Sequence, residues 1–319
     1  MLDRGPELAI PDESYFIPQI AQRHRGRIDV DAFLDDLRRL PALRDWGLPA
    51  ELVRPHLRPG ATVADGIAAV YETYAEQHGK ACWGDKTPMY MQHLGLLESL
   101  FPEALYVHLI RDGRDAALSF LSVPEGIMTE TWGHPRDAAG FARQWRTEVI
   151  LARELGGKAG PKRYLEVRYE ELVAEPELEL RRICAFAGLR FDPAMLDYAR
   201  AVDVSSKPHQ QSLRRPPTPG LRDWRGQLPG SDVVAFERIA GDLLAELGYE
   251  LVTRGPALVV GDLVFFSNLE TNTFAARVSN GQIVWRISLG KYAPGIATDQ
   301  RYYFSLNGLL MAFEGTGRS

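Results

Sequence analysis

One stretch of the chain decides the fold class. Residues 106–119 have the sequence YVHLIRDGRDAALS, in which a mostly apolar, strand-like run leads into Arg111-Asp112-Gly113 and then into a helix. In an open α/β sheet, ligands bind at the carboxyl ends of strands, and anions favour helix N-termini. Arg111 can bind a phosphate through two hydrogen bonds, and Ser119, two helical turns after Asp112, returns to the same face. The spacing predicts a phosphate clamp of Arg111 and Ser119; the alternative is that the charged residues form surface ion pairs at a helix start.

Helical and strand-like segments alternate around this stretch up to about residue 250. Apolar residues at spacings of three and four predict helices at Asp31–Leu40, Thr62–Lys80, Phe141–Leu155, Pro176–Gly188 and Asp232–Leu247. Short apolar runs predict buried strands at Ala81–Trp83, Ala104–Ile110 and Arg163–Val167. Strands that alternate with helices imply a mostly parallel sheet covered by helices on both faces, which is an α/β fold.

A second cation follows another short strand. Residues 83–88, WGDKTP, place Lys86 at a strand end, and Pro88 suits the first turn of the next helix. We therefore expect Lys86 to face the same crevice as Arg111. The alternative is a solvated lysine at a helix start.

The sequence changes in character after residue 255. From there on, strand-like runs are separated by Gly and Asn turns, and Asn280-Gly281 and Asn307-Gly308 are hairpin signals. We therefore divide the chain into a domain of residues 1–255 and an all-β segment of residues 256–319.

Composition excludes several classes of function. The chain has 319 residues, of which 45% are hydrophobic and 25% charged, and a net charge of -5, which argues against a disordered protein and against nucleic acid as a partner. No apolar run is long enough for a membrane span, and the N-terminus is not built like a signal peptide, so a cytoplasmic location is expected. Cys82, Cys184 and the histidines have no metal-ligand spacing, so no metal is expected.

Four segments taken together resemble the sulfotransferase family, whose members move a sulfuryl group from 3'-phosphoadenosine 5'-phosphosulfate to a hydroxyl or amine. The resemblance covers residues 1 to about 250. It rests on GDKTP at 84–88, IRDGRD at 110–115 with Ser119, VRYEEL at 167–172, and Trp224-Arg225 before the final helix. The resemblance implies a P-loop-NTPase-like, three-layer α/β fold with a mostly parallel sheet.

The resemblance also implies roles for individual residues. Arg111 and Ser119 would hold the 3'-phosphate of the donor, and Tyr169 would lie near its adenine nucleotide. Lys86 would stabilise the charge that builds up on the transferring group. Sulfuryl transfer resembles phosphoryl transfer, in which positioned cations and hydrogen-bond donors supply most of the catalysis. The resemblance implies no metal for the sulfuryl transfer.

Two further catalytic residues follow from a similarity to protein-tyrosine sulfotransferases. Glu13 stands where those enzymes have a glutamate as general base, a role that requires burial to raise the carboxyl pKa toward neutrality. The alternative is that Glu13 is a plain acid near a helix N-terminus. Ser206 resembles a serine that assists the transition state.

The chain departs from the family at its start. Family members open with a strand and a Gly/Ser/Thr-rich loop that binds the 5'-phosphosulfate, and the resemblance places both just before Met1, where this sequence begins. None of the 29 glycines forms a GxxxxGK[ST] motif. The resemblance therefore implies a sheet that lacks an inner strand, with unpaired backbone groups and an uncovered apolar edge.

Two functional classes follow. One is a sulfotransferase acting on a hydroxyl-bearing peptide, carbohydrate or small molecule. The other is a truncated gene product, catalytically impaired, that acts as a binding or interaction protein. A small-molecule kinase is a third alternative, against which the absence of a Walker lysine argues.

The all-β segment is similar to a quinoprotein (PQQ-like) β-propeller repeat. About one and a half repeats are present, whereas propellers close with at least about four blades. We expect an isolated blade, an edge through which the chain forms oligomers, or the beginning of a longer protein.

Overall fold

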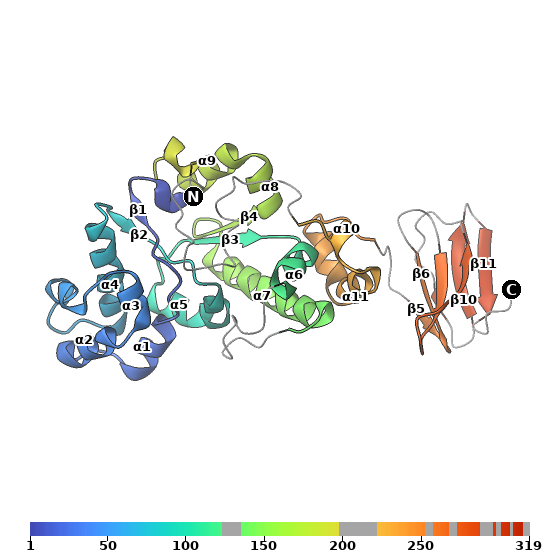
Figure 1. Cartoon of the computed structure of the whole chain (residues 1–319), viewed down its shortest axis with the longest axis horizontal. Coiled ribbons are helices and arrows are strands. Elements are labelled where there is room, and N and C mark those ends of the chain that lie inside the picture. The colour runs from blue at the N-terminus through green and yellow to red at the C-terminus, as the bar shows by residue number, and fades with distance from the viewer. Residues whose placement is uncertain are drawn as a thin grey trace. The chain divides into compact units, whose positions relative to one another are not determined.

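The computed structural model describes residues 1–122, 135–197, 222–252, 258–267, 273–287, 296–297, 301–306 and 309–314 (Figure 1). The chain divides into two compact units, each described here by itself. The first combines residues 1–111 with 147–221, and the second combines residues 112–146 with 222–319.

Helices make up most of the first unit. They are α1 (Ile17–Arg23), α2 (Val30–Arg38), α3 (Pro41–Asp45), α4 (Val63–Gln77), α5 (Leu94–Leu100), α8 (Tyr169–Ala174), α9 (Pro176–Ala187) and the 3-10 turns η1 (Leu2–Arg4), η2 (Ala50–Leu52), η3 (Arg54–His56), η4 (Pro88–His93) and η6 (Pro193–Met195). The long helix α7 (Ala138–Ala159) begins in the second unit and ends in the first. The helices predicted over α2, α4, α7 and α9 are confirmed.

Local sequence explains where these helices start. Asp29 caps α2 by accepting a hydrogen bond from Ala32, and Thr62 forms a capping box with Asp65 at the start of α4. Their apolar faces meet in one core that includes Phe33, Ile67 and other fully buried side chains. This core supports the segments that carry the candidate site.

The first unit contains two separate parallel strand pairs. Strand β1 (Leu8–Ala9) pairs with β2 (Cys82–Trp83), and β3 (Tyr106–Ile110) pairs with β4 (Tyr164–Arg168). The three predicted strands correspond to β2, β3 and β4, whereas β1 is too short to be recognised by periodicity. Among the described residues the two pairs are not joined into one sheet.

The helices of the second unit are α6 (Gly113–Leu121), the beginning of α7, α10 (Trp224–Gln227) and α11 (Gly230–Glu246). The helix predicted after Arg111-Asp112-Gly113 is α6, and that predicted over Asp232–Leu247 is α11. Trp145 and Phe236 pack against each other in the interior of this unit, with ring centroids 5.8 Å apart.

The C-terminal part of the second unit is antiparallel. Its strands are β5 (Leu258–Val260), β6 (Leu263–Ser267), β7 (Thr273–Arg277), β8 (Ile283–Ile287), β9 (Ile296–Ala297), β10 (Arg301–Leu306) and β11 (Leu309–Glu314). The first four form a meander, and the last three form a second sheet. The hairpin predicted at Asn280-Gly281 joins β7 to β8, with Gly281 at φ 71°. The described strands form no closed propeller ring.

Candidate functional site

Arg111 and Tyr169 lie together at the carboxyl ends of two paired strands. Ile110, the last residue of β3, is the register partner of Arg168, the last residue of β4. Arg111 and Tyr169, which directly follow these two residues, therefore lie at the same edge of the strand pair. The guanidinium of Arg111 lies over the Tyr169 ring, with its carbon 4.8 Å from the ring centroid.

One atom of Arg111 is left without a protein partner. Its Nε is buried and makes no hydrogen bond. A buried unsatisfied donor is costly unless another group satisfies it. A cation stacked on an aromatic ring, with a free donor at the end of a strand, is suited to binding an anion next to a flat ring system.

Ser119 lies on α6, in the second unit, and its carbonyl accepts a hydrogen bond from Ser122. The start of α6 is firmly defined, because the Asp112 carboxylate accepts the Arg114 backbone N–H at 2.9 Å. The helix predicted to carry Ser119 is thus confirmed. The clamp formed by Arg111 and Ser119 stays a prediction.

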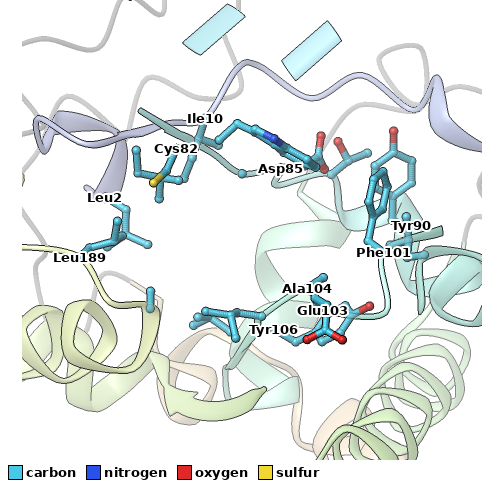
Figure 2. Close-up of a pocket in the computed structure, with 18 of the residues that line it drawn as sticks. Leu2, Ile10, Cys82, Asp85, Tyr90, Phe101, Glu103, Ala104, Tyr106 and Leu189 are labelled. Carbon is cyan, nitrogen blue, oxygen red and sulfur yellow. The ribbon is translucent and has the colours of Figure 1, made fainter. Parts of the chain in front are cut away.

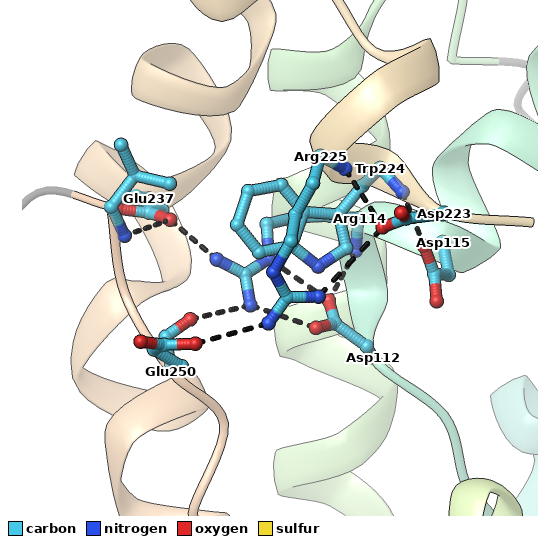
Figure 3. A network of polar contacts seen from close by, with 9 residues as sticks. Asp112, Arg114, Asp115, Asp223, Trp224, Arg225, Glu237 and Glu250 are labelled. Carbon is cyan, nitrogen blue, oxygen red and sulfur yellow. Dashed lines mark hydrogen bonds and ion pairs between the residues drawn. The ribbon is translucent and has the colours of Figure 1, made fainter. Parts of the chain in front are cut away.

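A buried ion network holds the start of α6 (Figure 3). Arg114 is fully buried, and its guanidinium binds Asp112, Glu237 of α11 and the backbone carbonyl of Glu250. It also lies 3.7 Å from the centroid of the Trp224 ring. Sequence reasoning left surface ion pairs open as the alternative for these residues. Arg114 and Asp112 do form an ion pair, but it is buried and not at the surface. Glu237 binds the Arg114 guanidinium, and the Trp224 ring stacks on it.

Glu13 and Lys86 form the second cluster of predicted residues. Lys86 Nζ donates a hydrogen bond to Glu13 Oε1. The Glu13 side chain is 42% exposed and Lys86 is more exposed still. The structure thus brings the predicted base and the predicted cation together at the surface of the first unit, without the burial that a general base requires.

The segment around Glu13 is attached to the segment that follows Lys86. Ser14 donates its backbone N–H to Thr87 Oγ1 at 3.2 Å, and its hydroxyl lies 3.2 Å from the Tyr90 hydroxyl. Tyr15 has a left-handed φ of 56°, which costs energy for a residue with a side chain. These contacts hold Glu13 beside Lys86.

The same segment contains residues that the sequence reasoning did not assign. Asp85, next to Lys86, accepts a hydrogen bond from the Tyr71 hydroxyl at 2.7 Å. Burial raises the pKa of Asp85, opposed by hydrogen bonds from Tyr71 and Thr87. Burial, together with the nearby Asp85 charge, raises the pKa of Tyr90 to about 12. Asp85 was visible in the GDKTP motif, but nothing in the sequence indicated its burial.

The predicted catalytic serine, Ser206, lies outside the described residues. Among the residues that the structure describes, no group of three His, Cys, Asp or Glu side chains is arranged to hold a metal ion. Within the same ranges, none of the helices has both the length and the hydropathy needed to cross a membrane.

Sequence comparison identifies relatives of the chain. The model of the "Sulfotransferase family" matches residues 1–193. The chain is 26% identical to protein-tyrosine sulfotransferase A of Caenorhabditis elegans, over 78% of this chain and 63% of that protein. It is 30% identical to nodulation protein NoeE of Sinorhizobium fredii, over 57% of this chain and 48% of that protein. It thus spans only about half to two thirds of the length of these curated relatives.

Structural comparison identifies similar folds. The sulfotransferase domain from the curacin biosynthetic pathway has a TM-score of 0.53 and 20% identity, over 78% of this chain and 92% of that chain. The sulfotransferase domain of the Synechococcus PCC 7002 olefin synthase has a TM-score of 0.52 and 24% identity, over 78% and 88%. At this identity the likeness shows the fold alone, and it confirms the predicted α/β fold class.

Proposed function

Because the chain belongs to the sulfotransferase family, we propose that it transfers a sulfuryl group from 3'-phosphoadenosine 5'-phosphosulfate to the hydroxyl of an acceptor. One observation carries the proposal. Arg111 stacks on Tyr169 and keeps a buried Nε without a hydrogen-bond partner. A donor with a phosphate beside an adenine nucleotide offers both an anion for Arg111 and a flat ring system near Tyr169.

The other predicted residues have roles that suit this transfer. Ser119 would add a hydroxyl donor to the phosphate held by Arg111. The donor supplies an activated sulfuryl group, which leaves its phosphate oxygen as it bonds to the acceptor oxygen. Lys86 would neutralise the negative charge that spreads over the transferring group. Glu13 would take the proton that the acceptor hydroxyl releases, and Ser206 would assist as a hydrogen-bond donor.

The contact between Glu13 and Lys86 is compatible with their proposed roles as base and charge stabiliser. In the structure the carboxylate is exposed and bonded to the lysine. A bound acceptor would cover Glu13 and draw Lys86 toward the sulfuryl oxygens, so that the burial needed by a general base arises only in the complex.

The names of the relatives suggest acceptor classes to test. They include protein-tyrosine sulfotransferases and carbohydrate sulfotransferases, one of which, mouse carbohydrate sulfotransferase 2, is 33% identical over 48% of this chain. We propose a hydroxyl on a peptide tyrosine or a carbohydrate as the acceptor.

A second function is favoured by one specific observation. Glu13, the proposed base, is exposed and bonded to Lys86 instead of buried. A chain that binds the nucleotide through Arg111 and Tyr169 but keeps this pair intact would not transfer the sulfuryl group, and would then act as a binding or interaction protein. Residues 256–319 are our proposed partial PQQ-like repeat and oligomerising edge; within them, strands β5–β8 have the strand number of one propeller blade.

Transfer of radiolabelled sulfate separates the two functions. The chain is incubated with labelled donor and with a tyrosine peptide, an oligosaccharide or a small phenol. Lys86→Ala is expected to lower kcat by roughly 100-fold, as for other groups that stabilise transition-state charge. Lys158→Ala, which removes an exposed lysine from α7, is the matched control.

The outcomes are distinct. Labelled product that depends on Lys86 and Glu13 supports the enzyme. Nucleotide binding without product from any of the acceptors contradicts sulfuryl transfer and favours the binding protein.

A further inference from the structure

A cluster of aromatic rings directly follows the proposed base Glu13. The Tyr15 and Tyr90 rings are stacked, with centroids 6.0 Å apart and an interplanar angle of 26°. The Tyr15 hydroxyl and His93 Nε2 are hydrogen-bonded at 2.9 Å, and the centroids of these two rings lie 5.7 Å apart. Tyr90 is buried, whereas Tyr15 and His93 are half-buried. The Tyr15 ring therefore lies over a buried ring and is itself still partly accessible.

The backbone of Tyr15 is strained. Its φ of 56° lies in the left-handed region, and within the part of the chain that the structure describes, Tyr15 is the only residue other than glycine with a positive φ. Such strain persists only where the surrounding contacts over-determine the conformation, and it is concentrated at functional sites. The strain therefore indicates a function for the Tyr15 side chain.

Contacts before and after this residue impose the strained conformation. The N–H groups of Ser14 and Ile17 donate hydrogen bonds to side chains of the segment 87–90, each at 3.2 Å. This segment directly follows Lys86, which binds the proposed base. The contacts therefore fix the Tyr15 ring within two residues of that base.

The aromatic cluster is separate from the large cavity of the first unit. This cavity has a volume of about 750 Å³, and Tyr90 and Asp85 belong to its lining (Figure 2). Tyr15, His93 and Glu13 are described residues that do not belong to this lining. A ligand on the Tyr15 ring would therefore lie outside the cavity.

An accessible aromatic face suits a ligand that is itself a ring. A phenol stacks on tyrosine, and the C–H face of a pyranose makes a similar apolar contact that removes surface from water. An open-chain alcohol offers no such face. We propose that Tyr15 selects acceptors whose reacting hydroxyl is carried by a six-membered ring, and that it does so by stacking on that ring beside Glu13. This role rests on the proposed function for the reaction, and His93 is a positioning residue that orients the Tyr15 ring.

Binding of small probes tests the role of Tyr15 without requiring transfer. Two matched pairs differ in the presence of the ring: N-acetyltyrosinamide against N-acetylserinamide, and methyl glucoside against sorbitol. Titrations followed by saturation-transfer NMR, with 3'-phosphoadenosine 5'-phosphate present, give the affinity of each probe. KM and kcat are measured with the labelled donor where product forms. The two pairs distinguish a phenol from a sugar as the source of the ring.

The variants separate the ring from the backbone. Tyr15→Asn removes the ring and should fold, because asparagine adopts the left-handed conformation more readily than most other residues with a side chain. Tyr15→Phe keeps the ring and loses only the hydrogen bond to His93. Tyr74→Gln is the matched control, since it removes another half-buried tyrosine ring, which packs against Trp46 and His78.

We expect the ring-bearing probe of at least one pair to bind the wild type roughly three- to tenfold more tightly than its open-chain partner. Tyr15→Asn should abolish this preference and raise KM for the ring-bearing acceptor, with little change in kcat. Tyr15→Phe and Tyr74→Gln should retain the preference.

Three results would overturn the role of Tyr15: equal affinities within both pairs, no binding of any probe to the folded wild type, or a preference that persists in Tyr15→Asn. Ring-dependent binding that Tyr15→Asn abolishes, without labelled product from any acceptor, would contradict sulfuryl transfer alone and would still support the role of Tyr15.

Discussion

The Arg111 guanidinium lies 4.8 Å above the centroid of the Tyr169 ring, although 57 residues of sequence, from 112 to 168, separate the two positions. The register of β3 against β4 explains the contact, because Ile110 and Arg168 are paired directly before them. The paired strands therefore hold the cation and the aromatic ring together before any ligand binds. As a result, little conformational entropy of these side chains is lost when a ligand binds.

The ring of Tyr169 should matter more than its hydroxyl. Tyr169→Ala removes the stacked face and is expected to weaken binding of 3'-phosphoadenosine 5'-phosphate by about 0.5–2 kcal/mol, whereas Tyr169→Phe keeps the face and should bind almost as the wild type does. Calorimetric titration measures both. Equal losses in the two variants would show that the stacked ring is not what the nucleotide needs.

Arg114 should be essential for folding. Arg114→Ala removes the buried guanidinium that binds the buried Asp112 and Glu237 carboxylates, and is expected to lower the free energy of unfolding by about 3–5 kcal/mol. Arg225→Ala breaks exposed ion pairs with Asp223 and Glu250 and a cation–π contact with the Trp224 ring, and should cost only about 1–2 kcal/mol. Urea unfolding compares the two, and similar losses would contradict the importance of the buried pair.

Gly113 should tolerate no side chain. A Cβ at this position would lie 2.5 Å from Phe236 Cζ and 2.7 Å from Trp145 Cδ2, both in buried rings. Gly113→Ala is therefore expected to destabilise the chain by about 1–3 kcal/mol. Gly157→Ala, in α7 with no atom within 4 Å of the added methyl group, should instead stabilise by about 0.5–1 kcal/mol. Thermal unfolding shows whether each variant is more or less stable than the wild type. A stabilising Gly113→Ala would contradict the close packing of Phe236 and Trp145 against the start of α6.

His108 should make stability depend on pH. Burial lowers its pKa from 6.5 to about 4, against the opposing charge of Glu166. Between pH 4 and pH 6.5 the unfolded chain binds a proton that the folded chain does not, so the free energy of unfolding rises with pH over this range. The contribution of His108 to stability is fully present above pH 6.5. As the pH falls toward 4, at most about 3 kcal/mol of stability is lost.

His108→Gln keeps a polar side chain but removes the titration. The difference in unfolding free energy between pH 7 and pH 5, measured with urea, should therefore shrink in this variant. An unchanged difference would show that other groups carry the acid sensitivity.

Elements with long, regular patterns could be predicted from the sequence. The apolar spacing of Thr62–Lys80 and the run before Arg111 correspond to α4 and β3, because burial of one face imposes the period. Short elements were not predicted, since the two residues of β1 and the five of α3 are too few for a hydrophobic period to repeat. Their position depends on contacts with distant parts of the chain.

The candidate site was partly predictable for the same reason. Residue types at strand ends indicated Arg111 and Lys86, and the resemblance added Glu13 and Tyr169. The buried role of Arg114 depends on Glu237, 123 residues away, and Tyr15, whose backbone is left-handed, contacts His93, 78 residues away. Neither leaves a pattern in neighbouring residues.

The most direct test of the account is calorimetric titration of the chain with 3'-phosphoadenosine 5'-phosphate. We expect binding on the order of micromolar that weakens by about 1.5–3 kcal/mol in Arg111→Ala, the range for a hydrogen-bonded charge. Arg44→Ala, which removes a highly exposed arginine from α3, should leave the affinity unchanged. A folded wild type that gives no heat, or an Arg111→Ala variant that binds equally well, would contradict the nucleotide site at Arg111 and Tyr169.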